Sequence, residues 1–77
     1  MLEIEKIRKE INKIDEKIIN LLKQRKEKVI FIGKVKKIKN LPIADKNREK
    51  EILSSLDSDY EKNIYKNILT ESRKLQF

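Results

Sequence analysis

The sequence predicts an all-α fold: a chain of three helices, one long and two short, that joins a second copy in a homodimeric helical bundle. Three observations predict it. Apolar residues recur in steps of three and four from Ile4 to Val35, which is the spacing of one helical face. The 77 residues include one Gly and one Pro, so few positions favour a turn. The chain is short and has no cysteine, so association with another chain is the remaining way to complete its core.

The long helix is predicted over residues 3–39. Its apolar stripe consists of Ile4, Ile7, Ile11, Ile14, Ile18, Leu21, Leu22, Val29, Ile32 and Val35. The first residues that stop a helix are Asn40, Leu41 and Pro42, because a proline moves the residue before it out of the helical region. A helix of this length extends for about 55 Å.

Two short helices are predicted in the rest of the chain. The first runs from about Asp45, whose side chain can cap its N-terminus, to about Ser55. The second runs from Tyr60 to the end of the chain, and the residues from Ser58 to Glu61 match a capping box.

These two helices are too short to cover the apolar stripe of a helix of about 55 Å. A second copy of the chain is the economical cover, because antiparallel pairing of the two long helices gives a closed twofold bundle. No repeat or linker divides the sequence, so residues 1–77 are expected to form a single domain.

Composition excludes several kinds of site. With no His and no Cys, the chain lacks the commonest general base, the commonest thiol nucleophile and most transition-metal ligands, so we expect no metal and no cofactor. One Gly leaves no phosphate-binding loop. No apolar run approaches the roughly 18 residues of a membrane span, and acids stand where a signal peptide carries bases, so a cytoplasmic protein is expected. The net charge of +7 favours an anionic partner.

Two cations occupy positions where the core of a helical bundle needs apolar side chains. Arg25 lies on the stripe between Leu22 and Val29, and Lys36 faces the same side of the helix to within about 20°. An inward cation must meet an acid or an anionic ligand, because an unpaired buried charge is costly. Arg25 therefore either reaches the rim or pairs with an acid such as Glu49, or it lines a polar pocket inside the bundle.

The last predicted helix changes character toward its C-terminus. Ile64, Ile68, Ser72 and Gln76 form a row at four-residue spacing that turns from apolar to hydrogen-bonding. Either this helix end is frayed, or Ser72 and Gln76 supply a hydroxyl and an amide to the opposite wall of the pocket.

Arg8 lies beside the stripe, about 25 Å along the helix from Arg25, so one small ligand cannot touch both within one chain. In an antiparallel dimer the start of one long helix can approach the later part of the other. Arg8 of one chain could then complete a site around Arg25 of its partner. The alternative is that Arg8 is a solvated surface charge. An enzyme built on such a site would depend on positioning and electrostatics rather than on proton transfer.

These residues resemble the all-helical class of chorismate mutases over the whole chain. The family's opening motif is similar to residues 7–18 (IRKEINKIDEKI), and its centre is similar to LKQR at 22–25 and IGKVK at 32–36. Its loop and second helix resemble LPIAD at 41–45 with the following Arg48 and Glu49. The end of its third helix resembles ESRKLQ at 71–76. Each motif alone is weak, but eight polar positions occur in order at the family's spacings.

The resemblance implies an interlocked dimer with two equivalent sites, each of which takes one arginine from the partner chain. It implies the conversion of chorismate to prephenate in aromatic amino-acid biosynthesis. Arg25 and the partner's Arg8 would hold the two substrate carboxylates, a task suited to the planar guanidinium. Lys36 would bridge a carboxylate and the ether oxygen, and Gln76 would donate its amide proton to that oxygen.

The remaining roles implied by the resemblance concern the ring of the substrate. Glu49 and the backbone near Asp45 would receive the ring hydroxyl, while Arg48 and Ser72 would line the pocket. The reaction is a concerted sigmatropic shift that requires no nucleophile and no base. That chemistry agrees with the residue types that the chain lacks.

Rival functions stay open at this point. Isochorismate-pyruvate lyases resemble chorismate mutases and share their set of cations. A basic helical nucleic-acid-binding dimer would use Lys23, Lys26, Lys28, Lys34, Lys37 and Lys39. Those lysines point around several sides of the helix and match no nucleic-acid motif, so we expect no nucleic acid and no membrane among the partners. A catalytically inactive regulatory relative is disfavoured, because every expected polar position is filled.

Overall fold

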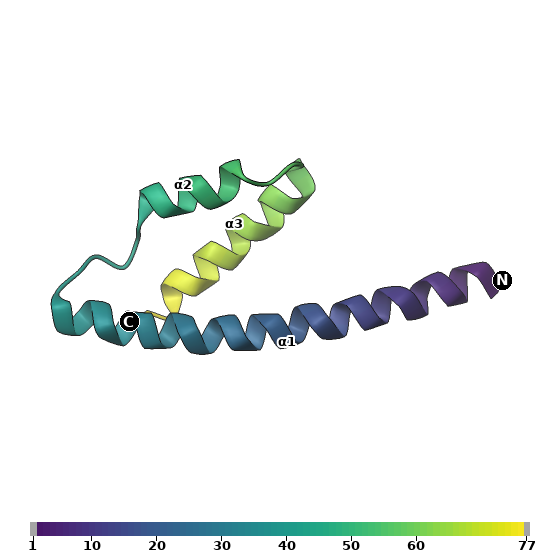
Figure 1. The fold of residues 1–77 in the computed structure, drawn as a ribbon, viewed down its shortest axis with the longest axis horizontal. Helices are drawn as coiled ribbons and strands as arrows, with labels where there is room; N and C mark the ends of the chain where they lie inside the picture. Colours follow the sequence, from purple (N-terminus) through teal and green to yellow (C-terminus); the bar gives the residue numbers. More distant parts are fainter. Residues whose placement is uncertain (1, 77) are drawn as a thin grey trace.

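The computed structural model describes residues 2–76, and all regular structure within them is helical (Figure 1). The helices are α1 (Leu2–Lys39), α2 (Lys46–Ser54) and α3 (Asp59–Lys74). One long helix followed by two short ones is therefore confirmed, with bounds that differ from the prediction by at most one residue. The exception is the end of α3, which stops at Lys74 instead of continuing to the end of the chain.

Asn40 ends α1 by adopting the left-handed backbone conformation, with φ of 57°. The N–H of Leu41 then donates to the carbonyl oxygen of Lys36 at 2.8 Å, and the N–H of Asn40 donates to that of Lys37 at 3.3 Å. This pair of bonds is the Schellman motif, in which an asparagine replaces the more common glycine. The stop that the sequence predicts before Pro42 thus has a specific backbone geometry.

Side-chain caps begin the two short helices as predicted. Asp45 accepts the backbone N–H of Arg48 at 3.1 Å at the start of α2. Ser58 accepts the backbone N–H of Glu61 at 3.4 Å at the start of α3, and its hydroxyl donates to the carboxylate of Glu61 at 2.7 Å. The Asp45 cap fixes the residue at which α2 begins, and so it fixes which side chains of α2 face α1.

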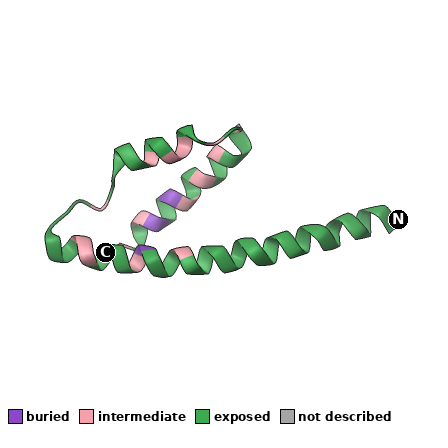
Figure 2. Cartoon of the chain, viewed as in Figure 1, coloured by how far each residue is buried: buried purple, intermediate pink, exposed green. Residues whose placement is uncertain are grey.

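The two short helices lie over the C-terminal half of α1, while its N-terminal half projects alone (Figure 1). The described residues extend over 56 Å in the longest direction, close to the length expected for α1. Apolar side chains along the projecting half are exposed, including Ile7 and Ile14 at 54% each (Figure 2). Two short helices leave the stripe uncovered, as predicted, whereas the homodimer stays a prediction.

The small core lies where α3 approaches α1. Val29 and Gly33 of α1 are buried there with Leu69 and Ser72 of α3. Among residues 2–76 no helix has the length and the apolar character to cross a membrane.

Candidate active site

A pocket of about 180 Å³ opens between the C-terminal half of α1, the start of α2 and the end of α3. Its apolar wall includes Val29, Ile32, Ile52 and Leu69. Seven of the eight residues that the sequence predicts for the site line it: Arg25, Lys36, Asp45, Arg48, Glu49, Ser72 and Gln76. The space suits one small organic molecule with polar groups at fixed positions.

Arg25 extends from α1 into this pocket and is held there by α3. Its guanidinium donates to the hydroxyl of Ser72 and lies 5.7 Å from the centroid of the Tyr65 ring. Ser72 is buried, and its hydroxyl donates in turn to the carbonyl oxygen of Ile68 at 2.6 Å. Arg25 therefore lines a pocket and is not paired with Glu49. The frayed-end interpretation is wrong for Ser72.

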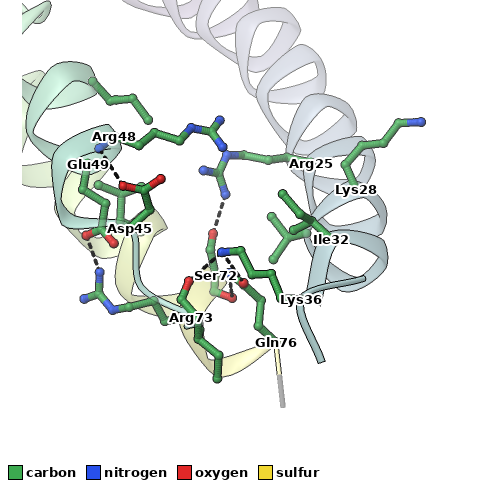
Figure 3. A pocket seen from close by; sticks show the side chains of 14 residues that line it. Arg25, Lys28, Ile32, Lys36, Asp45, Arg48, Glu49, Ser72, Arg73 and Gln76 are labelled. Carbon is green, nitrogen blue, oxygen red and sulfur yellow. Dashed lines mark hydrogen bonds and ion pairs between the residues drawn. The ribbon is translucent and has the colours of Figure 1, made fainter. Parts of the chain in front are cut away.

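Lys36 and Gln76 form a second polar pair, at the junction of α1 with the end of α3 (Figure 3). The Nζ of Lys36 donates to Oε1 of Gln76 at 3.0 Å and to the carbonyl oxygen of Ile43 at 2.6 Å. An ammonium group has donors only, so it selects the oxygen of the amide. The amide nitrogen of Gln76 is turned away from Lys36, 3.5 Å from the carbonyl oxygen of Ser72.

Gly33 allows the end of α3 to reach this position. A Cβ atom at residue 33 would lie 2.9 Å from Cα of Gln76 and 3.1 Å from its Cβ and Cγ. Those separations are below van der Waals contact, so a larger residue would displace Gln76. Gly33 belongs to the motif IGKVK, but its role was not predicted from the sequence. The sequence feature that could have indicated a role is that the one glycine of the chain lies inside a predicted helix, where glycine lowers helix stability.

The start of α2 supplies the third wall. The side chain of Arg48 points toward that of Arg25 across the pocket, whereas Lys28 of α1 points away from it (Figure 3). The carboxylate of Asp45 is used by the helix cap. Glu49 is bound by Arg73, with 2.5 Å between Nη1 and Oε1. Sequence reasoning missed Arg73, because a cation near the end of a helix is typical of a solvated surface.

Of the five cations that line the pocket, Arg25, Lys28, Lys36 and Arg48 have no carboxylate partner among the described residues, and Lys28 points away from the pocket. The two ion pairs of the described chain are Glu49 with Arg73 and Glu71 with Lys74. Arg25 and Lys36 instead donate to neutral oxygens, and the guanidinium of Arg48 is in neither ion pair. Arg25 and Lys36 are partly buried, whereas Arg48 is exposed. Cations that lack acids attract an anionic ligand, most strongly where they are partly enclosed. Residues 2–76 bring together no group of three carboxylates that could hold a metal ion.

Arg8 lies outside this pocket. It is exposed on the projecting N-terminal half of α1, while Arg25 lies under α3. A role for Arg8 in the same site therefore requires a second chain, as the sequence predicts, and that role stays a prediction.

Comparison with known proteins agrees with this arrangement. The family model described as chorismate mutase type II matches residues 7–77. The bifunctional chorismate mutase/prephenate dehydratase of Aquifex aeolicus (strain VF5) is 43% identical over 56 residues, which are 73% of this chain and 16% of that protein. The enzyme of the same description from Escherichia coli (strain K12) is 36% identical over 50 residues, 65% of this chain and 13% of that protein. The chain thus spans less than a fifth of the length of these relatives.

A solved structure is similar over the full length. A conserved hypothetical protein from Pyrococcus furiosus superposes with a TM-score of 0.92 and 43% sequence identity, covering 100% of this chain and 99% of that one. The match of the family model over nearly the whole chain, with seven of the eight polar residues of the family's motifs in one pocket, leads to one conclusion. The chain belongs to the chorismate mutase type II family.

Proposed function

We propose that this chain converts chorismate to prephenate in aromatic amino-acid biosynthesis, as a cytoplasmic enzyme. The observation that carries the proposal is the convergence of Arg25, Lys36 and Arg48 on one pocket without a carboxylate partner among the described residues. Membership of the chorismate mutase type II family supports the same substrate.

The pocket of one chain offers partners for one carboxylate, the ether oxygen and the ring hydroxyl of chorismate. Arg25 is already oriented by Ser72, so its remaining N–H groups can bind a carboxylate in the bidentate manner. Lys36 uses two of its three donors on protein oxygens and has one left for the ligand. The carboxylate of Glu49, on the α2 side of the pocket, can accept the ring hydroxyl.

The reaction needs no bond to the protein. The ether C–O bond of chorismate breaks while the new C–C bond forms, and the pocket selects the compact conformer in which the two carbons meet. Negative charge grows on the ether oxygen during this step. Lys36 has one donor left for that oxygen, and the Gln76 amide supplies a second when its NH₂ group turns from the carbonyl oxygen of Ser72 toward the ligand. One well-placed donor lowers such a barrier by about 3 kcal/mol.

A second copy of the chain completes the proposed site. The exposed stripe on the N-terminal half of α1 needs an apolar partner, and an apolar groove between α1 and α3 runs beside Arg25. Leu22, Ile64, Ile68 and Leu75 line that groove. If the partner's α1 runs antiparallel and packs here, its Arg8 approaches Arg25 and binds the second carboxylate of chorismate.

The experiment that tests the proposed function is a direct assay of the purified chain. Loss of chorismate and appearance of prephenate are expected, with Lys23→Ala as a control that removes an exposed cation of α1 and keeps the activity. A parallel incubation with isochorismate identifies a lyase by the release of salicylate and pyruvate. Folded protein that leaves chorismate intact would contradict the proposal.

A further inference from the structure

Arg73 forms an ion pair on the wall of the pocket to which nothing so far assigns a function. Its Nη1 lies 2.5 Å from Oε1 of Glu49, and its Nη2 donates to the hydroxyl of Thr70 at 3.2 Å. The side chains of Arg73 and Glu49 are 38% and 24% exposed, so the pair is only partly solvated. Thr70 lies one turn earlier on α3 and fixes the direction of the guanidinium toward α2.

Glu49 is the carboxylate of this pocket that could otherwise turn toward the ligand-binding cations. The second carboxylate in the lining, that of Asp45, is already used as the cap of α2. Arg48 is the neighbour of Glu49 on the same helix, and Arg48 and Arg25 point toward each other across the pocket (Figure 3). In a partly enclosed pocket, opposite charges attract more strongly than they do in water. A carboxylate left free at residue 49 would therefore pair with these arginines.

Such pairing would oppose the binding of a dicarboxylate. An arginine that already holds Glu49 must release it before it can bind a carboxylate of the ligand, and the affinity falls accordingly. Figure 3 shows Glu49 turned the other way, toward Arg73 and away from Arg25. The pair uses Oε1, so Oε2 of Glu49 remains for a hydroxyl of the ligand.

We propose that Arg73 is a positioning residue: it holds Glu49 on the α2–α3 side of the pocket, so that Glu49 pairs neither with Arg25, which binds a substrate carboxylate, nor with the neighbouring Arg48. The inference rests on the proposed function for the identity of that substrate. It differs from a tether between α2 and α3, because a tether affects the free energy of unfolding and has no specific effect on the affinity for an anion.

The test compares the variants Arg73→Met, Glu49→Gln and the double variant that carries both substitutions. We expect Arg73→Met to raise the KM for chorismate about tenfold, with a smaller change in kcat, because Glu49 then competes for the arginines. Adding Glu49→Gln should lower the KM again, to within about threefold of that of Glu49→Gln alone, because an amide carries no charge to compete. If Arg73 only tethered α2 to α3, adding Glu49→Gln to Arg73→Met would not improve binding.

Lys74→Met is the matched control, because it removes one cation from an ion pair on the neighbouring residue of α3. That pair, Lys74 with Glu71, is 67% exposed on both sides and lies at 2.7 Å. Its loss should leave the KM unchanged. Circular-dichroism melting checks that each variant is folded at the assay temperature, and Arg73→Gln, which retains a donor for Thr70, replaces Arg73→Met if that variant is unfolded.

Equilibrium binding separates this inference from the proposed function. The same order of affinities is expected for prephenate in calorimetry, which requires no turnover. Binding of prephenate in that order by a chain that leaves chorismate intact would contradict the proposed reaction and support the role of Arg73. A KM and a prephenate affinity for Arg73→Met within about twofold of wild type, or a double variant that binds no better than Arg73→Met, would overturn the inference.

Discussion

Lys36 and Gln76 act on each other before any ligand arrives. The ammonium group of Lys36 accepts no hydrogen bond, so it holds the Oε1 side of the Gln76 amide and leaves the NH₂ group as the donor. That NH₂ group lies 3.5 Å from the carbonyl oxygen of Ser72, so it reaches the ether oxygen by turning toward the ligand, without a proton transfer. An amide also keeps its donor across the ordinary pH range, which suits a site whose chemistry is electrostatic.

Gln76→Glu tests this orientation through the pH dependence of activity. A carboxyl group can donate to the ether oxygen only while it is protonated, so activity should be retained at acidic pH and fall as the pH rises through the pKa of the new carboxyl. At neutral pH we expect a loss of about a hundredfold in kcat/KM, the effect of one missing donor. The wild-type chain should show no such decline over the same range. A variant whose pH profile matches wild type would remove Gln76 from the reaction.

The sequence predicted which residues line the pocket better than it predicted which residues they bind. Arg25 and Lys36 are recognisable in the sequence because each places a charge on an apolar stripe. The partner of Glu49 is not recognisable in the sequence, because Arg73 lies 24 residues away and contacts Glu49 only when α2 and α3 pack together. The same packing decides that Ser72, rather than an acid, receives Arg25.

The crossing of α3 over α1 depends on the single glycine of α1. A glycine inside a helix costs about 1 kcal/mol relative to alanine, so Gly33 weakens α1 taken alone. In return, Gly33 lets Gln76 approach α1, because the backbone of Gln76 occupies the space that a Cβ atom at residue 33 would need.

Gly33→Ala should therefore lower activity although it improves helix propensity. The new methyl group would push Gln76 away from Lys36, and we expect kcat/KM to fall at least about tenfold, the scale of a misplaced donor. In a Gln76→Ala background the same substitution should change kcat/KM little, because the donor is already gone. Steady-state kinetics of the two single variants and the double variant measures this, and full activity in Gly33→Ala would contradict the role of the close approach.

Helix bounds were predictable wherever a local signal sets them. Asn40, Asp45 and Ser58 end or begin helices through bonds to residues a few positions away, and such bonds follow from sequence. The end of α3 has no proline, glycine or asparagine to mark it, and the prediction there was too long. Leu75 and Gln76 instead continue in a turn that donates to the carbonyl oxygens of Ser72 and Arg73. That turn is what brings Gln76 over Gly33.

The molecule as a whole has too little core for one chain. Among residues 2–76 the buried hydrophobic side chains are those of Val29 and Leu69, while the stripe of α1 faces solvent over its N-terminal half. Small domains without disulfides or metals usually complete their cores by association. Folding and dimerisation should therefore be one process.

Coupled folding makes the melting temperature depend on protein concentration. We expect the midpoint measured by circular dichroism to rise when the chain concentration increases from micromolar to hundreds of micromolar. Sedimentation equilibrium should give twice the mass of the chain. A helical monomer that melts at the same temperature at every concentration would contradict the dimer and the shared site with it.

The sequence predicted the need for a second chain from the length of the apolar stripe, and the exposed isoleucines of α1 agree with that reasoning. It could not give the packing of two copies, because complementarity between surfaces depends on side-chain positions that a one-dimensional pattern lacks. Arg8 is therefore the site residue whose place rests on the dimer alone.

Subunit mixing tests most directly the claim that a dicarboxylate is held by cations from two chains. Arg8→Ala and Arg25→Ala should each be nearly inactive, because either substitution leaves one carboxylate unpaired in both sites. When the two variants are unfolded together and refolded at equal concentration, a heterodimer collects both substitutions in one site and neither in the other. Random pairing should then restore about a quarter of wild-type chorismate mutase activity. No recovery in a sample shown to contain heterodimers would contradict the shared site.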